Sequence, residues 1–282
     1  MKKPILLVID KIGSGGAQSQ ICMLAAEFVR LGFSVTLVTY HRSEMLQRHR
    51  NLLTRVSWIR ISLAKRGIWG TLNRLKQVVE QRKPLAVIAY LRGSSFMAPI
   101  ACQLARADTS VITSERSSFT NGRPMIRDYA SRASLLLADH IVCNSREQCG
   151  SISRYMPWLK KKVKYIPNGI SSGWFAGTGH PSTRGQNIIG VGRVHPSKDL
   201  SYFISAIASI SEELRRRQVK VKWTGRIENK LYFDQIETEI NQNSLHDIWV
   251  WNGEQSNMLD VYYDASLFVM TSNLEGMPNV LI

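Results

Sequence analysis

Short apolar runs rich in β-branched residues alternate with longer amphipathic stretches, and this alternation is the feature that most limits how the chain can fold. Seven such runs precede Asn168, at 5–9, 34–39, 56–61, 85–90, 111–114, 140–144 and 163–167. The stretches between them, such as 17–31, 71–81 and 96–106, have the apolar spacing of helices. Strands that alternate with helices predict a parallel sheet covered on both faces.

The pattern stops and then starts again. Residues 171–186 are rich in Gly, Ser and Thr, which is typical of a linker. Strand-like runs resume at 187–192, 219–224, 248–251 and 267–271, with a helix expected at 197–210. We therefore predict a first Rossmann-like domain at 1–172, a linker at 173–186 and a second Rossmann-like domain at 187–282. Residues 277–282 read as the opening turn of a helix, so we expect the second domain to be incomplete.

The charge of the chain is strongly positive and unevenly distributed. The formal net charge is +16, and residues 1–180 contain 27 Lys and Arg against 9 Asp and Glu. Residues 181–282 contain 10 basic and 12 acidic residues. The excess favours an anionic partner for the first domain, namely membrane phospholipid, nucleic acid or a phosphorylated substrate. A solvated surface that needs no partner is the alternative.

Cysteine spacing and hydropathy indicate a protein without disulfides, zinc or membrane spans. The four cysteines form no Cys-x-x-Cys pair, so we expect reduced thiols and a cytoplasmic location. No apolar run reaches 18 residues, and no signal sequence is visible. The sequence contains no Asp-x-Asp pair, so no metal site is predicted.

A glycine-rich turn, 13–17, follows the first strand and opens the first helix. Backbone N–H groups at a helix N-terminus attract anions, and glycine lets a phosphate approach the backbone. The spacing is not Gly-x-Gly-x-x-Gly, and no acidic residue follows about 20 positions later, which disfavours a dinucleotide fold. The alternative is a tight turn without a ligand.

Two further loops follow strands of the second domain, where open α/β sheets bind ligands. In 191–199, Arg193 and Lys198 stand five residues apart and can converge on one diphosphate, with Ser197 expected to cap the next helix. The alternative is a pair of solvated charges. In 272–282, the carboxylate of Glu275 can accept hydrogen bonds from sugar hydroxyls, and Gly276 and the residues after it can offer backbone N–H groups.

With these motifs, the sequence resembles family 4 of the glycosyltransferases. The resemblance covers the whole chain and is carried by Gly15-Gly16-Ala17, 166–170 (Ile-Pro-Asn-Gly-Ile), Gly192-Arg193 with Lys198, and 275–281 (Glu-Gly-Met-Pro-Asn-Val-Leu). It implies the GT-B fold, in which two doubly wound domains face a cleft. It also implies transfer of a sugar from a nucleotide donor with retention of anomeric configuration.

The resemblance implies roles for the matching positions. Arg193 and Lys198 would bind the donor diphosphate and stabilise its charge as it leaves, and Glu275 would contact the donor sugar. The family's second Glu would occupy position 283, one beyond Ile282, so we expect a truncated chain. The nucleotide-sugar would be bound by Gly15, Gly16, Gly276, Met277, Pro278, Asn279 and Val280.

Segment 113–119 (Thr-Ser-Glu-Arg-Ser-Ser-Phe) is a further point of similarity to family members that build bacterial surface polysaccharides. We therefore expect Glu115 or Arg116 to face the donor sugar. The alternative is an internal ion pair, either Glu115 with Arg116 or Arg116 with Asp128.

The sequence thus leads to one main prediction and three alternatives. The main one is a metal-independent hexosyl- or N-acetylhexosaminyltransferase. It needs no cofactor besides its substrate, a UDP- or GDP-sugar. It acts on a glycan or lipid-linked acceptor in lipopolysaccharide, O-antigen or capsule synthesis. The basic first domain would hold the acceptor and draw the protein to the cytoplasmic face of the inner membrane.

The alternatives are a nucleotide-sugar epimerase of the same fold, an inactive truncated fragment and a nucleic-acid-binding protein. The last is suggested by a pI of about 10.0, but the sequence shows no nucleic-acid recognition motif.

Overall fold

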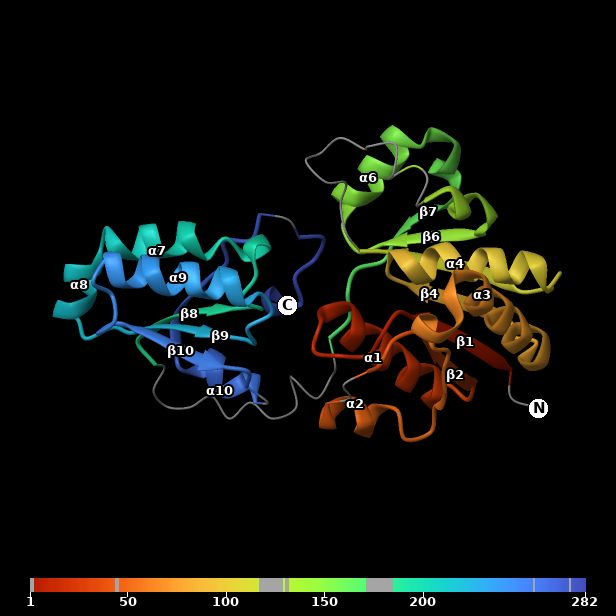
Figure 1. The fold of residues 1–282 in the computed structure, drawn as a ribbon, viewed down its shortest axis with the longest axis horizontal. Helices are drawn as coiled ribbons and strands as arrows, with labels where there is room; N and C mark the ends of the chain where they lie inside the picture. Colours follow the sequence, from red (N-terminus) through yellow and green to blue (C-terminus); the bar gives the residue numbers. More distant parts are fainter. Residues whose placement is uncertain are drawn as a thin grey trace. The chain divides into compact units, whose positions relative to one another are not determined.

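The computed structural model describes residues 3–43, 46–116, 129, 132–170, 185–255, 257–273 and 275–282. The chain divides into two compact units. The first consists of Met1–Ser171 and Gly276–Asn279, and the second consists of Ser172–Glu275 and Val280–Ile282. Each unit has its own parallel sheet with helices packed against it (Figure 1). Most of the predicted linker lies outside the described residues.

The first unit is built on a seven-stranded parallel sheet with the order β3-β2-β1-β4-β5-β6-β7. The winding reverses between β1 and β4, which is the doubly wound topology. All seven predicted runs form strands, and the α/β prediction is confirmed. Their bounds are β1 Pro4–Ile9, β2 Ser34–Thr39, β3 Ser57–Arg60, β4 Ala86–Tyr90, β5 Ser110–Glu115, β6 His140–Cys143 and β7 Val163–Tyr165.

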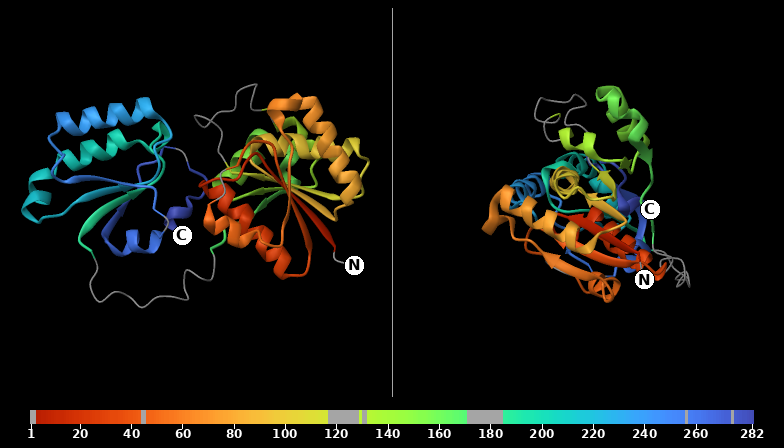
Figure 2. Two further views of the ribbon diagram at one scale, coloured as in Figure 1. Left: turned by 60° about the horizontal axis from the view of Figure 1, so that its bottom comes forward. Right: turned by 90° about the vertical axis from the view of Figure 1, so that its right-hand side faces the viewer.

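Helices cover both faces of this sheet because its central strands are apolar along their length, so that successive side chains are buried on opposite faces. Leu6 and Val8 of β1 enter one buried cluster, whereas Ile5, Leu7 and Ile9 enter another. Figure 2 shows α1 on one side of the sheet and α3 and α4 on the other. The helical elements are α1 Gly16–Arg30, α2 Gln47–Leu52, α3 Leu63–Arg82, α4 Arg92–Leu104, η2 Ala133–Leu137, α6 Arg146–Tyr155 and η3 Pro157–Lys162.

Helix α3 begins well before the predicted start at 71. Gly67 has a φ of 62°, so the backbone kinks there and the turn before it is set apart from the main helix. Glycine adopts this conformation without the penalty that a Cβ would bring. The hydroxyl of Thr71 donates to the carbonyl of Gly67 at 2.7 Å and ties the two parts together. The spacing of apolar residues alone could not predict the helical turn that precedes this glycine.

The second unit has a four-stranded parallel sheet with the order β10-β9-β8-β11. Its strands are β8 Asn187–Val191, β9 Val221–Thr224, β10 Trp249–Gly253 and β11 Ala265–Val269. Its helical elements are η5 Pro196–Lys198, α7 Leu200–Ala208, α8 Ser211–Arg216, α9 Lys230–Gln242 and α10 Met258–Tyr263. The short turn η6, Asn279–Leu281, begins with a residue of the first unit and ends in the second. The predicted four strands are all present, and the last residues form a short 3-10 turn.

The expectation that Ser197 caps the helix after β8 is wrong. Pro196–Lys198 forms a separate 3-10 turn, and the cap of α7 is Asp199, whose side chain accepts a hydrogen bond from the backbone of Tyr202. Asp199 has a φ of 47°, a left-handed conformation that Asp tolerates better than most residues. The left-handed residue ends the 3-10 turn and starts α7 two residues later than a Ser197 cap would require.

Aromatic side chains fill the core of the second unit. Trp223 and Trp249 are buried, and the centroid of the Phe203 ring lies 6.1 Å and 5.6 Å from the centroids of their rings.

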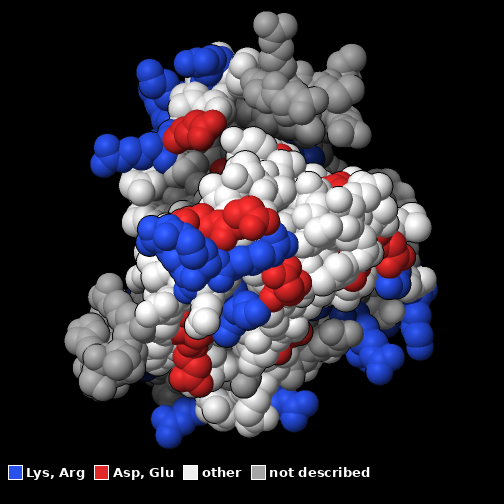
Figure 3. Space-filling view, turned by 90° about the vertical axis from the view of Figure 1, so that its left-hand side faces the viewer, with Lys and Arg blue, Asp and Glu red and all other residues white. Residues whose placement is uncertain are grey.

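The surface charges of the second unit are mixed: Figure 3 shows Lys and Arg side chains beside Asp and Glu side chains on the face that it draws. The four cysteines are free thiols. Among the described residues, no helix is both long and apolar enough to cross a bilayer.

We predict that Gly190→Ala destabilises the second unit. Gly190 in β8 lies against the Trp223 indole, and an added methyl group would overlap the ring. Overpacking of this kind costs about 1–3 kcal/mol. Gly150→Ala is the matched control because a methyl group at that helical position meets nothing within 4 Å. It should stabilise the protein slightly. Urea unfolding followed by circular dichroism measures both, and equal stability of the two variants would contradict the packing described here.

Candidate functional site

The two motif loops of the second unit follow neighbouring strands. Residues 192–198 follow β8, residues 270–275 follow β11, and β8 pairs with β11 in parallel. Parallel neighbours end at the same edge of a sheet, so both loops emerge side by side. Ligands of open α/β sheets bind at this edge.

Hydrogen bonds join these two loops directly. The backbone N–H of Asn273 donates to the carbonyl of Ser197 at 3.1 Å, and the hydroxyl of Thr271 donates to the carbonyl of Lys198 at 2.8 Å. The ammonium of Lys198 forms an ion pair with the carboxylate of Glu275. Their side chains are 15% and 27% exposed, so the pair is largely shielded yet reachable from solvent. Two of the predicted catalytic side chains therefore lie in contact.

Arg193 lies on the same loop and pairs with a carboxylate that the sequence analysis did not identify. Its guanidinium contacts Glu228, which follows β9, and Arg226 lies 3.4 Å from the other oxygen of Glu228. Partial burial raises the pKa of Glu228, but the hydrogen bond and charge of Arg193, together with the charges of Arg226 and His195, outweigh this effect. The pKa of Glu228 therefore lies below its ordinary value.

A buried core residue, Trp223, contacts the start of the Arg193 loop. Trp223 Nε1 donates to the carbonyl of Gly192 at 2.9 Å, and the indole fills the space beside Gly192. The imidazole of His195 accepts a hydrogen bond from the backbone of Ser197 and caps the short turn at Pro196. His195 thus has a structural role in this turn.

In the first unit, the glycine turn opens helix α1. Gly15 is the N-cap in an extended conformation and supplies no side-chain cap, so backbone N–H groups of the first turn remain available to an anion. Asn279, whose segment packs in this unit, donates from Nδ2 to the carbonyl of Gly16 at 3.1 Å. Gly15 and Gly16 therefore lie at the open end of a 15-residue helix.

Asn168 of the Ile-Pro-Asn-Gly-Ile segment connects several predicted site residues. Its Nδ2 donates to the carbonyl of Met277 at 3.0 Å and to Oδ1 of Asn279 at 2.6 Å. Its Oδ1 accepts from Arg116 at 2.5 Å. The Arg116 guanidinium stacks on the Tyr90 ring, 4.2 Å from its centroid, and burial lowers the pKa of Arg116. The motif indicated that Asn168 matters but not that its side chain joins these segments.

Glu115 lies in the interior rather than on an open surface. Its carboxylate accepts from Arg132 at 3.1 Å, and the two side chains are 3% and 1% exposed. An internal ion pair was the alternative in the sequence, but its partner is Arg132, which was not foreseen. Ser117, Ser118, Phe119 and Asp128 lie outside the described residues.

The other predicted positions lie in the last segment of the chain. Gly276 packs against the side chain of Asn144, leaving no room for a larger residue. The carbonyl of Val280 accepts a hydrogen bond from the hydroxyl of Tyr262 at 2.8 Å. Pro278, which lies between Gly276 and Val280 in the sequence, is half-buried. Leu274 lies outside the described residues.

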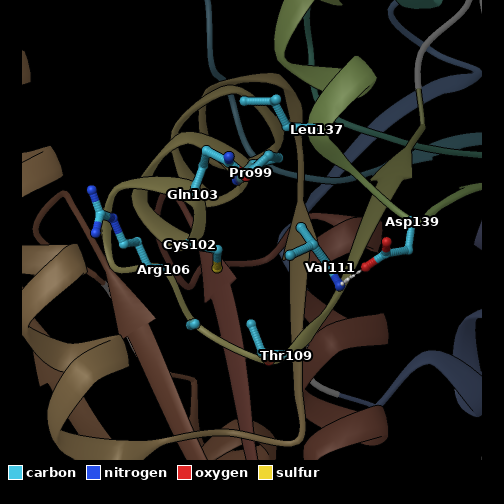
Figure 4. Close-up of a pocket in the computed structure, with 9 residues that line it drawn as sticks. Pro99, Cys102, Gln103, Arg106, Thr109, Val111, Leu137 and Asp139 are labelled. Atoms are coloured by element: carbon cyan, nitrogen blue, oxygen red, sulfur yellow. Dashed lines mark hydrogen bonds between the residues drawn. The ribbon is translucent and has the colours of Figure 1, made fainter.

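A cavity of about 330 Å³ in the first unit contains none of these residues. Figure 4 shows it between the end of α4 and the start of β5, with Cys102, Arg106, Thr109 and Asp139 in its wall. This is the opposite end of β5 from Glu115. Burial raises the pKa of the Cys102 thiol to about 12, with a smaller effect from Asp139, so this cysteine is a poor nucleophile. Among the described residues, no cluster of His, Cys, Asp and Glu could hold a metal ion.

Comparison with known proteins identifies the class to which this fold and these loops belong. Residues 14–173 match the family model "Glycosyltransferase Family 4", and residues 185–282 match "Glycosyl transferases group 1". The chain belongs to glycosyltransferase family 4. This confirms the resemblance on which the site residues were predicted.

Two relatives of known name are bacterial glycosyltransferases. A GalNAc-α-(1→4)-GalNAc-α-(1→3)-diNAcBac-PP-undecaprenol α-1,4-N-acetyl-D-galactosaminyltransferase of Campylobacter jejuni is 22% identical over 99% of this chain and 75% of its own length. The putative glycosyltransferase EpsF of Bacillus subtilis is 22% identical over 100% of this chain and 76% of its own length.

Solved structures show the same fold. Anabaena HepE in complex with UDP and glucose superposes with a TM-score of 0.73 at 15% identity, covering 95% of this chain and 74% of HepE. The lipopolysaccharide outer core galactosyltransferase WaaB, in its apo form, superposes with a TM-score of 0.67 at 14% identity, covering 99% of this chain and 76% of WaaB. The fold is therefore GT-B, with two Rossmann-like domains.

We predict that Arg193→Ala raises the pKa of Glu228. The arginine is the main group that stabilises the carboxylate, and without it the effect of burial remains. In the parent, this stabilisation is present above the ordinary pKa of the carboxyl and is lost as the pH falls through the lowered value. Carboxyl NMR titration measures the pKa, with Glu27 as the control because its partner is Arg30. An unchanged pKa of Glu228 would mean that Arg193 does not hold this carboxylate in solution.

Proposed function

We propose that this protein transfers a hexosyl or N-acetylhexosaminyl group from a UDP- or GDP-sugar to a glycan or lipid-linked acceptor, with retention, in bacterial cell-surface polysaccharide synthesis. The observation that carries the proposal is the Lys198–Glu275 contact beside Arg193 at one edge of the second sheet. Two cations and one sugar-binding carboxylate are the groups that a nucleotide-sugar needs. The glycosyltransferase family of the chain supports this assignment.

In the proposed reaction, the bond between the anomeric carbon and a diphosphate oxygen breaks. The nucleoside diphosphate leaves with the electron pair, the acceptor hydroxyl oxygen bonds to the anomeric carbon, and the hydroxyl proton passes to the departing diphosphate. Negative charge grows on the diphosphate as the bond breaks. Arg193 and Lys198 would stabilise that charge more in the transition state than in the ground state, which raises the rate.

The carboxylates beside these cations would exchange with the substrate. Glu275 is paired with Lys198 and Glu228 is paired with Arg193. A diphosphate carries more charge than either carboxylate and would displace them. Glu275 would then be free to accept hydrogen bonds from the donor sugar. The Arg193–Glu228 pair is the more exposed of the two, and such pairs contribute at most about 1 kcal/mol. At the more shielded Lys198, the diphosphate would replace one anion by another, so no charge would be left unpaired.

Two relatives support the choice of substrates. The Campylobacter jejuni relative acts, by its name, on a diphospho-undecaprenol-linked glycan, which supports a lipid-linked acceptor here. HepE was solved with UDP and glucose, which supports a UDP-sugar donor. The basic first domain supports work at the cytoplasmic face of the inner membrane, where anionic lipid attracts Lys and Arg.

We predict that Arg193→Ala lowers turnover by about 100- to 1,000-fold, the cost of removing one preorganised charge-stabilising donor. Arg193→Lys should recover part of the loss, because it keeps the charge but not the planar fork. Turnover with a UDP- or GDP-sugar and unchanged circular dichroism are the two measurements. Arg154→Ala, in helix α6, is the matched control. Turnover of Arg193→Ala within twofold of the parent would rule out the diphosphate role.

We also predict that UDP or GDP binding and transfer persist in EDTA. Arg193 and Lys198 would supply the positive charge that a divalent cation supplies in other transferases. Titration calorimetry with and without EDTA tests this. Loss of nucleotide binding on chelation, restored by Mn²⁺, would contradict metal independence. Conversion of the donor to its epimer without any acceptor would instead favour an epimerase.

A further inference from the structure

One segment of the first unit is basic without interruption. Residues 45–79 contain eight Lys and Arg residues and no Asp or Glu. Arg60, Lys65 and Arg66 are exposed, and they surround the junction between β3 and α3. Lys76 pairs with Glu80, just after this segment, and the excess of basic residues that remains generates a field that attracts an anionic surface.

This junction lies at the edge of the sheet that carries the site loops. Arg60 ends β3, and the chain continues directly into α3. The backbone N–H groups of Ile61 and Leu63 still donate to the carbonyls of Thr39 and Tyr40, at 2.8 and 3.1 Å, at the end of β2. All strands of this sheet are parallel. The start of α3 therefore shares an edge with the glycine turn after β1 and with Arg116 after β5.

Two large apolar side chains lie in the middle of this basic segment. Ile68 is 58% exposed and Trp69 is 82% exposed. Ile68 continues, four residues upstream, the stripe of Leu72, Leu75 and Val79 that packs in the core. The stripe thus extends beyond the sheet that it covers. An indole with an apolar body and a polar N–H is well suited to the boundary between lipid and water.

We propose that Lys65–Trp69 is a membrane anchor, in which Ile68 and Trp69 enter the interfacial layer of an anionic bilayer. Lys65, Arg66 and Arg60 would meet the lipid headgroups. Apolar burial combined with basic residues is how peripheral proteins bind such surfaces. The inference rests on the proposed function. A membrane-held acceptor must reach the edge of the first sheet where the glycine turn and Arg116 lie.

A second exposed tryptophan with basic neighbours lies at the other end of the strands of this sheet. Trp158 in η3 is 59% exposed and is followed by Lys160, Lys161 and Lys162. This turn precedes β7, so it lies at the edge opposite the site loops. The ammonium of Lys162 donates to the carbonyls of Leu136 and Ala138, at 2.7 and 2.8 Å, and is thus engaged within the protein. Trp158 is therefore a matched control for Trp69.

Co-sedimentation with vesicles tests the proposal. The vesicles contain phosphatidylcholine with about 30% phosphatidylglycerol, or phosphatidylcholine alone, in about 0.1 M salt, where screening acts over about 10 Å. The variants are I68S/W69S, K65Q/R66Q and W158S. Circular dichroism and the binding of UDP and GDP are measured for each.

The anchor predicts a specific pattern. I68S/W69S should bind anionic vesicles about 10-fold more weakly, because two partly buried apolar side chains are lost. K65Q/R66Q should bind about 25-fold more weakly, at about 1 kcal/mol or fivefold per basic residue. W158S should bind within twofold of the parent. Neutral vesicles should bind the parent only weakly.

Several results would overturn the anchor. These are parental binding by I68S/W69S, loss of binding by W158S alone, and equal binding to neutral vesicles. Preference for single-stranded DNA over vesicles at the same salt would also overturn it, in favour of a nucleic-acid partner. Nucleotide binding reports separately on the proposed function. If neither UDP nor GDP binds the parent, the proposed function fails, while the vesicle results still decide whether Lys65–Trp69 binds membranes.

Discussion

Parallel strand pairing is the constraint on which the candidate site depends. Because neighbouring parallel strands end at one edge, β8 and β11 deliver Lys198 and Glu275 to the same place although 77 residues separate them in sequence. Helices must fill the connections between such strands, so the loops that carry chemistry can vary while the sheet holds their origins fixed. The same rule places the glycine turn, Arg116 and the start of α3 at one edge of the first sheet.

The alternation of apolar runs was enough to predict both sheets, because strands buried on two faces must be apolar along their whole length. The loops that hold Arg193, Lys198 and Glu275 could be predicted because they follow such strands. Partners brought in by tertiary packing could not: Glu228, Arg132 and the side-chain contacts of Asn168 belong to no local pattern. The early start of α3 and the Asp199 cap depended on single left-handed residues, which periodicity does not register.

Charged groups in this protein fall into two physical classes. Glu115 and Arg132 are sealed in the interior, where removal of one partner would leave an uncompensated charge at a cost of about 3–5 kcal/mol. Arg193–Glu228 is partly exposed and can separate at small cost, whereas Lys198–Glu275 is more shielded but still reachable from solvent. The first class fixes the architecture around β5, and the second leaves cations available to a ligand. Burial thus distinguishes a structural Glu115 from an exchangeable Glu275, although both were candidates from sequence.

The indole of Trp223 belongs both to the core of the second unit and to the support of the Gly192 carbonyl. Folding and chemistry therefore share one side chain. A substitution of Trp223 that alters the rigidity of the Arg193 loop must also change the melting temperature of this unit. Heat inactivation should coincide with the loss of its aromatic core, instead of preceding it as it does in enzymes whose active-site loops melt first. A thermostable version would have to be reached through surfaces remote from β8 and β9, which constrains where adaptation to a warmer habitat could begin.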